Sequence, residues 1–127
     1  MILNLQTLKN NCTKMLEKAA TNKCLLRPHV KTHKTIQGAL LQTGGVKYRI
    51  TCSTLAECEF FKKAGFDDIL YAVPIDPTKL IRANEISKNL KDFKILVDNI
   101  HQVRKLQEFR PAIPWNVTLM VDCGYGR

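Results

Sequence analysis

Residues 53–73, STLAECEFFKKAGFDDILYAV, carry the signals of one helix, its end and the strand that follows. Thr54 with Glu57 three positions later is the pattern of a capping box at a helix amino terminus. Gly65 is a typical residue just beyond the last helical turn. The apolar run at the end of the stretch has the length of one buried strand. The stretch therefore predicts a helix over residues 55–64 and a strand over residues 68–73.

The same order of helix and strand recurs on both sides of this unit. Before it, apolar spacing and glycine positions predict a helix over residues 3–20, a strand over 24–31, a helix over 34–43 closed by Gly44-Gly45, and a strand over 47–52. After it, the sequence predicts a helix starting at Pro77, a strand over 93–97, a helix capped by Asp98 or Asn99, and a strand over 115–121. The order is one helix, then strand–helix four times, then a strand.

This alternation of apolar strands and helices predicts a parallel α/β sheet. The first strand is not followed by Gly-x-Gly-x-x-Gly, which disfavours a dinucleotide-binding sheet. A (β/α)₈ barrel has the same alternation but typically needs about 250 residues, and the chain has 127. About five strands in an open arc would leave unpaired edges. The pattern therefore fits either a small open sheet or a partial TIM-like barrel, and the stop soon after a strand favours the partial barrel.

The charge balance raises the question of an anionic partner. Twenty Lys and Arg residues against 11 Asp and Glu give a formal net charge of +9, which would suit nucleic acid or an anionic ligand. The basic residues, however, are spread along the chain, mostly on expected outer helix faces, and aromatic residues are not interleaved with them. We therefore expect no nucleic-acid partner. We also expect no membrane association, since no apolar run could cross a bilayer.

The cysteines indicate the compartment. Five cysteines without a Cys-x-x-Cys pair disfavour a disulfide framework and a zinc ribbon. Cys12, Cys24 and Cys58 lie in apolar patterns and are expected to be small buried side chains. No secretory signal precedes them. We expect a soluble protein of a reducing, cytoplasmic compartment.

Three basic side chains alternate along the first predicted strand. Arg27, His29 and Lys31 are two residues apart, so they share one face. Burying unpaired cations is costly, so this face needs anionic partners or water. The residue types alone leave three interpretations open, ranked from first to last: a solvated basic face, an anion site, and a metal pair formed by His29 and His33.

Residues 27–34, RPHVKTHK, resemble the cofactor-lysine motif of the D-serine dehydratase and D-threonine aldolase family, which are alanine-racemase-like pyridoxal-phosphate (PLP) enzymes of fold type III. Residues 53–57 (STLAE), 65–72 (GFDDILYA) and 121–127 (VDCGYGR) resemble three further motifs of that family, in the same order. The match covers nearly the whole chain. Residues 26–35 and 66–72 are most similar to the eukaryotic D-serine dehydratases.

The resemblance implies that residues 1–127 are the N-terminal part of a PLP-binding barrel, with the remaining strands and a C-terminal β domain outside this chain. Lys31 would be the catalytic residue that forms a Schiff base with PLP, and His29 and Arg127 would also contact the cofactor. Asp122 and Gly124 would shape the same strand end. The family also uses a zinc ion held by its C-terminal part, so no residue of this chain is assigned to a metal. Tyr125 departs from the small, polar or methionine residue that relatives carry there.

The activity implied by the resemblance is that of a lyase for a small D-amino acid. With D-serine, Lys31 would remove the α-proton, the β-hydroxyl would leave with the help of zinc, and pyruvate and ammonia would form. Arg27 and a protonated His29 would favour the neutral amine of Lys31 and attract the cofactor phosphate. The alternatives are a D-threonine aldolase and a non-catalytic PLP-binding protein. We expect a homodimer for the full-length protein, and an inactive, associating fragment for these residues alone.

Overall fold

The computed structural model describes residues 2–109 and 114–126. Within this part of the chain, four parallel strands form one sheet in the order β1-β2-β3-β4. The strands are β1 (Ile50–Cys52), β2 (Asp68–Pro74), β3 (Asp92–Val97) and β4 (Asn116–Leu119). The helices are α1 (Leu5–Thr21), α2 (Ile36–Gln42), α3 (Leu55–Lys63), α4 (Leu80–Ser87, after the 3₁₀ turn η1, Pro77–Lys79) and α5 (Ile100–Phe109). Each strand pairs with the next in the chain, as in a partial (β/α)₈ barrel.

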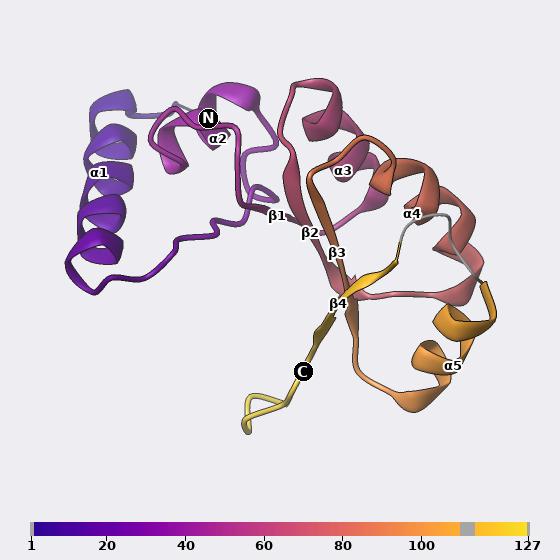
Figure 1. Cartoon of the computed structure of the whole chain (residues 1–127). Coiled ribbons are helices and arrows are strands. Elements are labelled where there is room, and N and C mark those ends of the chain that lie inside the picture. Colours follow the sequence, from indigo (N-terminus) through magenta and orange to yellow (C-terminus); the bar gives the residue numbers. More distant parts are fainter. Residues whose placement is uncertain (1, 110–113, 127) are drawn as a thin grey trace.

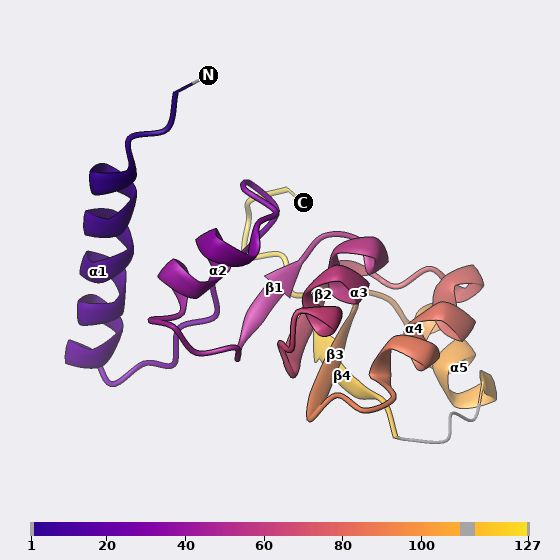
Figure 2. The same ribbon diagram turned by 90° about the horizontal axis from the view of Figure 1, so that it is seen from above.

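The helices that connect the strands cover one face of the sheet. α3, α4 and α5 lie together along the outer side of β2 and β3 (Figure 1). α1 stands apart from this layer, beyond α2 (Figure 2). None of the helices in residues 2–109 and 114–126 is long and apolar enough to cross a membrane. The prediction of a partial barrel is confirmed, with four regular strands in place of about five.

The predicted strand over residues 24–31 is wrong as a regular strand. The segment runs along the edge of β1 but makes only a single parallel bridge, between His29 and Thr51. The Val30 N–H donates to the Thr51 carbonyl at 3.0 Å, and the Thr51 N–H donates to the Pro28 carbonyl at 2.9 Å. Pro28 has no N–H to extend the ladder. The chain then turns at once, since the Lys34 N–H donates to the Val30 carbonyl at 2.9 Å.

The helix-facing side of the sheet forms the hydrophobic core. The pairing register places Ile50, Ile69 and Phe93 in one row, and Cys52, Tyr71 and Ile95 in the next. All of these side chains are buried, and Tyr71 is among the largest of them. Helices α3, α4 and α5 complete the core with the side chains of Leu55, Cys58, Phe61, Leu80, Ala83, Ile86 and Leu106.

The helix boundaries follow the local signals in the sequence. The Thr54 hydroxyl accepts the Glu57 N–H at 3.1 Å, and the Glu57 carboxylate accepts the N–H of Ser53, one residue before the cap, at 2.7 Å. Gly65, at φ +90°, follows the end of α3. Asn99, rather than Asp98, accepts the Gln102 N–H at the start of α5. These contacts confirm the predicted capping box and the predicted helix end.

The predicted burial of the cysteines is partly wrong. Cys12 and Cys58 are buried as expected, and all five cysteines are free thiols. Cys24 is exposed, because it lies three residues past the end of α1, after a turn in which Lys23 has φ +54°. The apolar spacing that placed it in a buried pattern does not continue beyond the helix.

Candidate functional site at the carboxyl ends of the strands

One residue of each of three sequence motifs lies just beyond the carboxyl end of a strand or of the strand-like segment. Lys31 follows the bridge residue His29, Ser53 is the first residue after β1, and Asp122 comes three residues after β4. In parallel (β/α) folds, binding sites form at the carboxyl ends of the strands, because the connecting loops converge there. Residues 29–34, 53–57 and 121–126 therefore lie at the edge of the sheet where such sites form.

The side chain of Lys31 extends into solvent at the end of the strand-like segment. Lys31 is exposed, and within the described residues its Nζ atom makes neither a hydrogen bond nor an ion pair. Its neighbour Lys34 differs, because the Lys34 Nζ atom lies 3.2 Å from Oε1 of the buried Glu57. Within this turn, Lys34 balances a buried carboxylate, whereas Lys31 presents its primary amine to solvent.

His29 lies between the backbone of Lys31 and the end of β1. Its Nδ1 atom accepts the Lys31 backbone N–H at 3.3 Å, and its Nε2 atom lies 3.2 Å from the Ser53 hydroxyl. Sequence reasoning did not assign Ser53 to the site. The available signal was its position two residues after Thr51, which the bridge places beside His29 on the same face.

The sequence predicts that the charge of Arg27 acts on Lys31. In the structure this charge is instead paired with a carboxylate. Its Nη2 atom lies 2.7 Å from Oδ1 of Asp68, the first residue of β2, and its Nη1 atom donates to the Ile50 carbonyl at 3.3 Å. The Lys94 amine also contacts Asp68, at 3.2 Å. Arg27 therefore belongs to an ion-pair layer at the amino-terminal end of the strands, where Asp68 balances its charge.

The loop after β4 folds around one carboxylate oxygen. Oδ1 of Asp122 accepts the backbone N–H groups of Gly124, Tyr125 and Gly126 at 2.9, 2.9 and 3.2 Å. Both glycines have positive φ values, +97° and +74°, which permit this curled path. The side chain of Tyr125 is exposed. Arg127 lies outside the described residues, so its contact with the cofactor stays a prediction.

The two histidines of the motif have separate partners. The ring of His33 contacts Gln42 Oε1 through Nε2 at 2.9 Å and accepts the Thr35 N–H at Nδ1 at 3.1 Å. Among the described residues, no three His, Cys, Asp or Glu side chains are grouped so that they could hold a metal ion. His29 and His33 each contact a backbone N–H in or next to the turn that contains Lys31.

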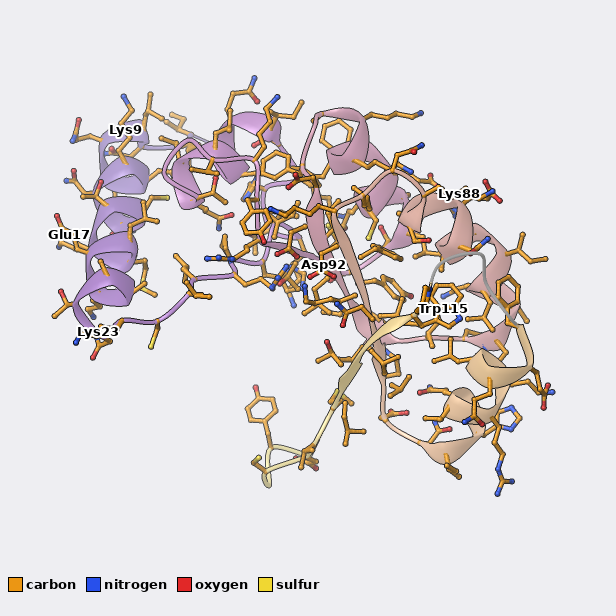
Figure 3. The ribbon with its side chains drawn as sticks, viewed as in Figure 1. Lys9, Glu17, Lys23, Lys88, Asp92 and Trp115 are labelled. Atoms are coloured by element: carbon orange, nitrogen blue, oxygen red, sulfur yellow. The ribbon has the colours of Figure 1, made fainter. Side chains whose placement is uncertain are left out.

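Lysines on the helices account for much of the positive charge. Figure 3 shows Lys9, Glu17 and Lys23 on or just after α1, far from Asp92 on the sheet. Lys9, Lys14, Lys18, Lys63, Lys79 and Lys88 are all exposed. Their exposure agrees with the prediction that these lysines lie on solvated helix faces.

Sequence comparisons place this chain among known proteins. The profile of the family described as "Alanine racemase, N-terminal domain" matches residues 3–127. A D-serine dehydratase of Dictyostelium discoideum is 38% identical, and the match covers 94% of this chain and 33% of that protein. A D-serine dehydratase of Schizosaccharomyces pombe is 34% identical, with 94% and 31% coverage. The chain thus spans about a third of the length of these relatives.

Solved structures agree with the sequence comparisons. The D-threo-3-hydroxyaspartate dehydratase of a Delftia species superposes with a TM-score of 0.83 at 32% identity, covering 92% of this chain and 31% of that one. The D-threonine aldolase of Filomicrobium marinum superposes with a TM-score of 0.84 at 28% identity, covering 99% and 35%. On the evidence of both the profile and the fold, this chain belongs to the alanine racemase N-terminal domain family.

Proposed function

We propose that residues 1–127 are the N-terminal part of a PLP-dependent D-amino-acid lyase that converts D-serine to pyruvate and ammonia, with Lys31 as the residue that holds the cofactor. The observation that carries the proposal is the exposed amine of Lys31, unpaired within the described residues, at the end of the strand-like segment beside β1. The D-serine dehydratases among the relatives support the choice of substrate.

The residues at this edge fit the aldehyde end of PLP. An aldehyde is attacked by a neutral primary amine that is free of competing ion pairs. Among the described residues the Lys31 amine has no ion pair, whereas the Lys34 amine is paired with Glu57. In (β/α)₈ barrels a phosphate is commonly held by the loops after the seventh and eighth strands. We therefore assign the phosphate contacts to segments outside this chain.

In this site the chain's own residues hold the cofactor and move a proton. Bound PLP would accept the electron pair left on the substrate α-carbon when its proton departs. Lys31 Nζ would carry the cofactor covalently and, once the substrate has displaced it, take the α-proton as general base. Arg127 is proposed as a second cofactor contact. Departure of the β-hydroxyl would be assisted by a zinc ion held by the C-terminal part of the protein.

The alternative activity is that of a D-threonine aldolase. The fold of such an aldolase superposes on this chain with a TM-score of 0.84, and another, from an Arthrobacter species, is 28% identical in sequence. Both activities begin with a D-amino acid bound to the same cofactor. They differ in the bond that breaks next, and the residues that would select that bond lie outside this chain.

The experiment that tests the proposal uses the full-length protein supplied with PLP and zinc. We expect pyruvate from D-serine and its loss in Lys31→Ala, while Lys9→Ala, which alters an exposed lysine on α1, keeps the activity. Glycine and an aldehyde from D-threonine without pyruvate from D-serine would favour the aldolase. Cofactor absorbance that depends on Lys31 without turnover of either substrate would indicate a non-catalytic PLP-binding protein.

Two properties of the full-length protein belong to the same proposal. We expect it to form a homodimer, which sedimentation velocity would measure directly. We also expect it in the cytoplasm, where its thiols stay reduced, in agreement with the five free cysteines.

A further inference from the structure

Two histidine rings flank Lys31 and make the same contact with the backbone. Nδ1 of His29 accepts the N–H of Lys31, two residues later, at 3.3 Å. Nδ1 of His33 accepts the N–H of Thr35, also two residues later, at 3.1 Å. The turn between them is closed by the Lys34 N–H, which donates to the Val30 carbonyl at 2.9 Å. Lys31 thus lies in a turn with a ring contact at either end.

These contacts determine where the ring protons are. A ring nitrogen that accepts an N–H carries no proton, and a doubly protonated imidazolium has no acceptor nitrogen. With Nδ1 as the acceptor, each ring would be neutral and would carry its proton on Nε2. The Nε2–H of His29 would then face the Ser53 hydroxyl at 3.2 Å, and the Nε2–H of His33 would face Oε1 of Gln42 at 2.9 Å.

The Nε2 contacts tie the turn to two regular elements. Ser53 follows the end of β1, and Gln42 is the last residue of α2. Gln42 also donates from its side-chain amide to the His29 carbonyl, at 3.5 Å, which links the two ring systems. The His33 ring packs against Gly38, where an added Cβ would lie only 2.5 Å from Nδ1. The backbone position of Lys31 therefore depends on a side-chain network that spans residues 29–53.

We propose that His29 and His33 are positioning residues that fix the turn presenting Lys31, each as the neutral Nε2–H tautomer. In this role His29 does not act as a cation beside the lysine, which differs from the expectation drawn from the sequence. The role of Lys31 as the cofactor lysine rests on the proposed function. The assignment of the two tautomers rests only on the contacts described above. The two statements can therefore fail separately.

The first test reads the tautomers directly. Long-range proton–nitrogen NMR spectra of the full-length, cofactor-free protein with ¹⁵N-labelled histidine distinguish a bare ring nitrogen from a protonated one. At neutral pH we expect a bare Nδ1 and a protonated Nε2 for both His29 and His33. The exposed His101 on α5 is the internal reference. An Nδ1–H tautomer or an imidazolium at either His29 or His33 would overturn the proposal.

The second test separates the two ring nitrogens by substitution. In His29→Asn the amide oxygen can replace Nδ1 as acceptor, whereas in His29→Gln the amide nitrogen can replace only the Nε2 donor. One hydrogen bond corresponds to about a three- to tenfold change in an equilibrium. We therefore expect the Lys31 amide proton to exchange about three- to tenfold faster in His29→Gln and at nearly the original rate in His29→Asn. His101→Asn is the matched control. Equal exchange in all three variants would refute the positioning role.

A third measurement connects the turn to the cofactor. Reductive labelling with PLP and cyanoborohydride, followed by mass spectrometry, gives the labelling rate of each lysine. We expect Lys31 to be labelled fastest, and His29→Gln to slow this rate by about three- to tenfold while His29→Asn does not. If Lys31 is not labelled in the unaltered protein although both tautomers are as expected, the proposed function fails and the assignment of the tautomers stands.

Discussion

The Nη2 atom of Arg27 lies 2.7 Å from Oδ1 of Asp68, a carboxylate whose side chain is only 3% exposed. The contact connects the segment before α2 to the first residue of β2, across β1. Lys94 contacts the same carboxylate at 3.2 Å and also pairs with Asp92. Two cations and two carboxylates, from the segment before α2 and from strands β2 and β3, therefore form one charge-balanced layer.

Asp68→Asn should destabilise the protein strongly. The substitution removes the carboxylate charge that balances Arg27 and leaves Lys94 with Asp92 alone. Breaking a buried pair costs about 3–5 kcal/mol, and we expect about 3 kcal/mol because both cations are partly exposed. Urea denaturation of the full-length protein measures the loss. Glu108→Gln, which removes an exposed pair with Lys105, is the control and should cost less than about 1 kcal/mol. Equal losses of stability in Asp68→Asn and Glu108→Gln would show that the buried ion pairs do not stabilise the fold.

Gly38→Ala tests whether the His33 ring or helix propensity determines the stability of α2. In a helix interior, alanine is favoured over glycine by about 1 kcal/mol. The new Cβ, however, would lie 2.5 Å from Nδ1 of His33, and overpacking costs about 1–3 kcal/mol. We expect a net loss of about 1 kcal/mol in thermal denaturation. Gln37→Ala, on the same helix but exposed, should change stability by less than about 0.5 kcal/mol. A stabilised Gly38→Ala protein would show that the ring does not occupy this position.

The ion pair of Glu59 with Arg82 gives a prediction about pH. Hydrogen bonds from Arg82, at 2.7 and 2.8 Å, hold the pKa of the Glu59 carboxyl below its ordinary value of 4.5. A carboxyl whose pKa is lower in the folded state stabilises the protein above the unfolded pKa, and this contribution is lost as the pH falls through the folded pKa. We therefore expect Glu59→Gln to cost up to about 1 kcal/mol at pH 7.

The pH profile supplies the check on this pair. The difference between the unaltered protein and Glu59→Gln should stay constant from about pH 8 to pH 5 and should shrink below about pH 4. Thermal denaturation at a series of pH values measures it. A difference that grows on acidification would show that the bond to Arg82 does not lower the pKa of Glu59.

Local signals predicted the elements well because the interactions behind them span only a few residues. The Thr54 cap, the Gly65 helix end and Pro77 at the start of η1 each depend on contacts within one turn. The segment over residues 24–31 failed as a strand because the missing donor of Pro28 and the turn after Val30 prevent a second bridge. Alternation correctly placed Arg27 and His29 on one face, but it carries no information on strand length.

The candidate site was predictable only in part, because its contacts join distant residues. The motif resemblance pointed to Lys31, whose amine makes neither a hydrogen bond nor an ion pair within the described part of the chain. Asp68, which pairs with Arg27, is 41 residues away from it, and Ser53, one of the residues that His29 contacts, is 24 residues away. Both pairs depend on how the sheet segments are aligned, which composition and spacing do not determine. Arg27 therefore pairs with Asp68 and does not add an unpaired charge beside Lys31.

The exposed side of β4 predicts how residues 1–127 behave alone. Val117 pairs in register with the buried Ile95, so it lies on the helix-facing side, yet it is 43% exposed. Leu119 and Val121, two and four residues further on, are 66% and 68% exposed. No helix in the described part of the chain covers these three side chains, and an uncovered apolar edge of a sheet promotes association.

We therefore expect the isolated 127 residues to associate with increasing concentration and to show no turnover of D-serine. Sedimentation velocity measures the association, and a pyruvate assay measures turnover. Replacing Leu119 with Lys should shift the protein toward monomer, because a charge on this edge disfavours pairing. Ile81→Lys is the matched control, since Ile81 is 71% exposed but lies on α4 rather than on a sheet edge. A monomer that unfolds in one cooperative thermal transition would show that the partial barrel is stable without a covering segment.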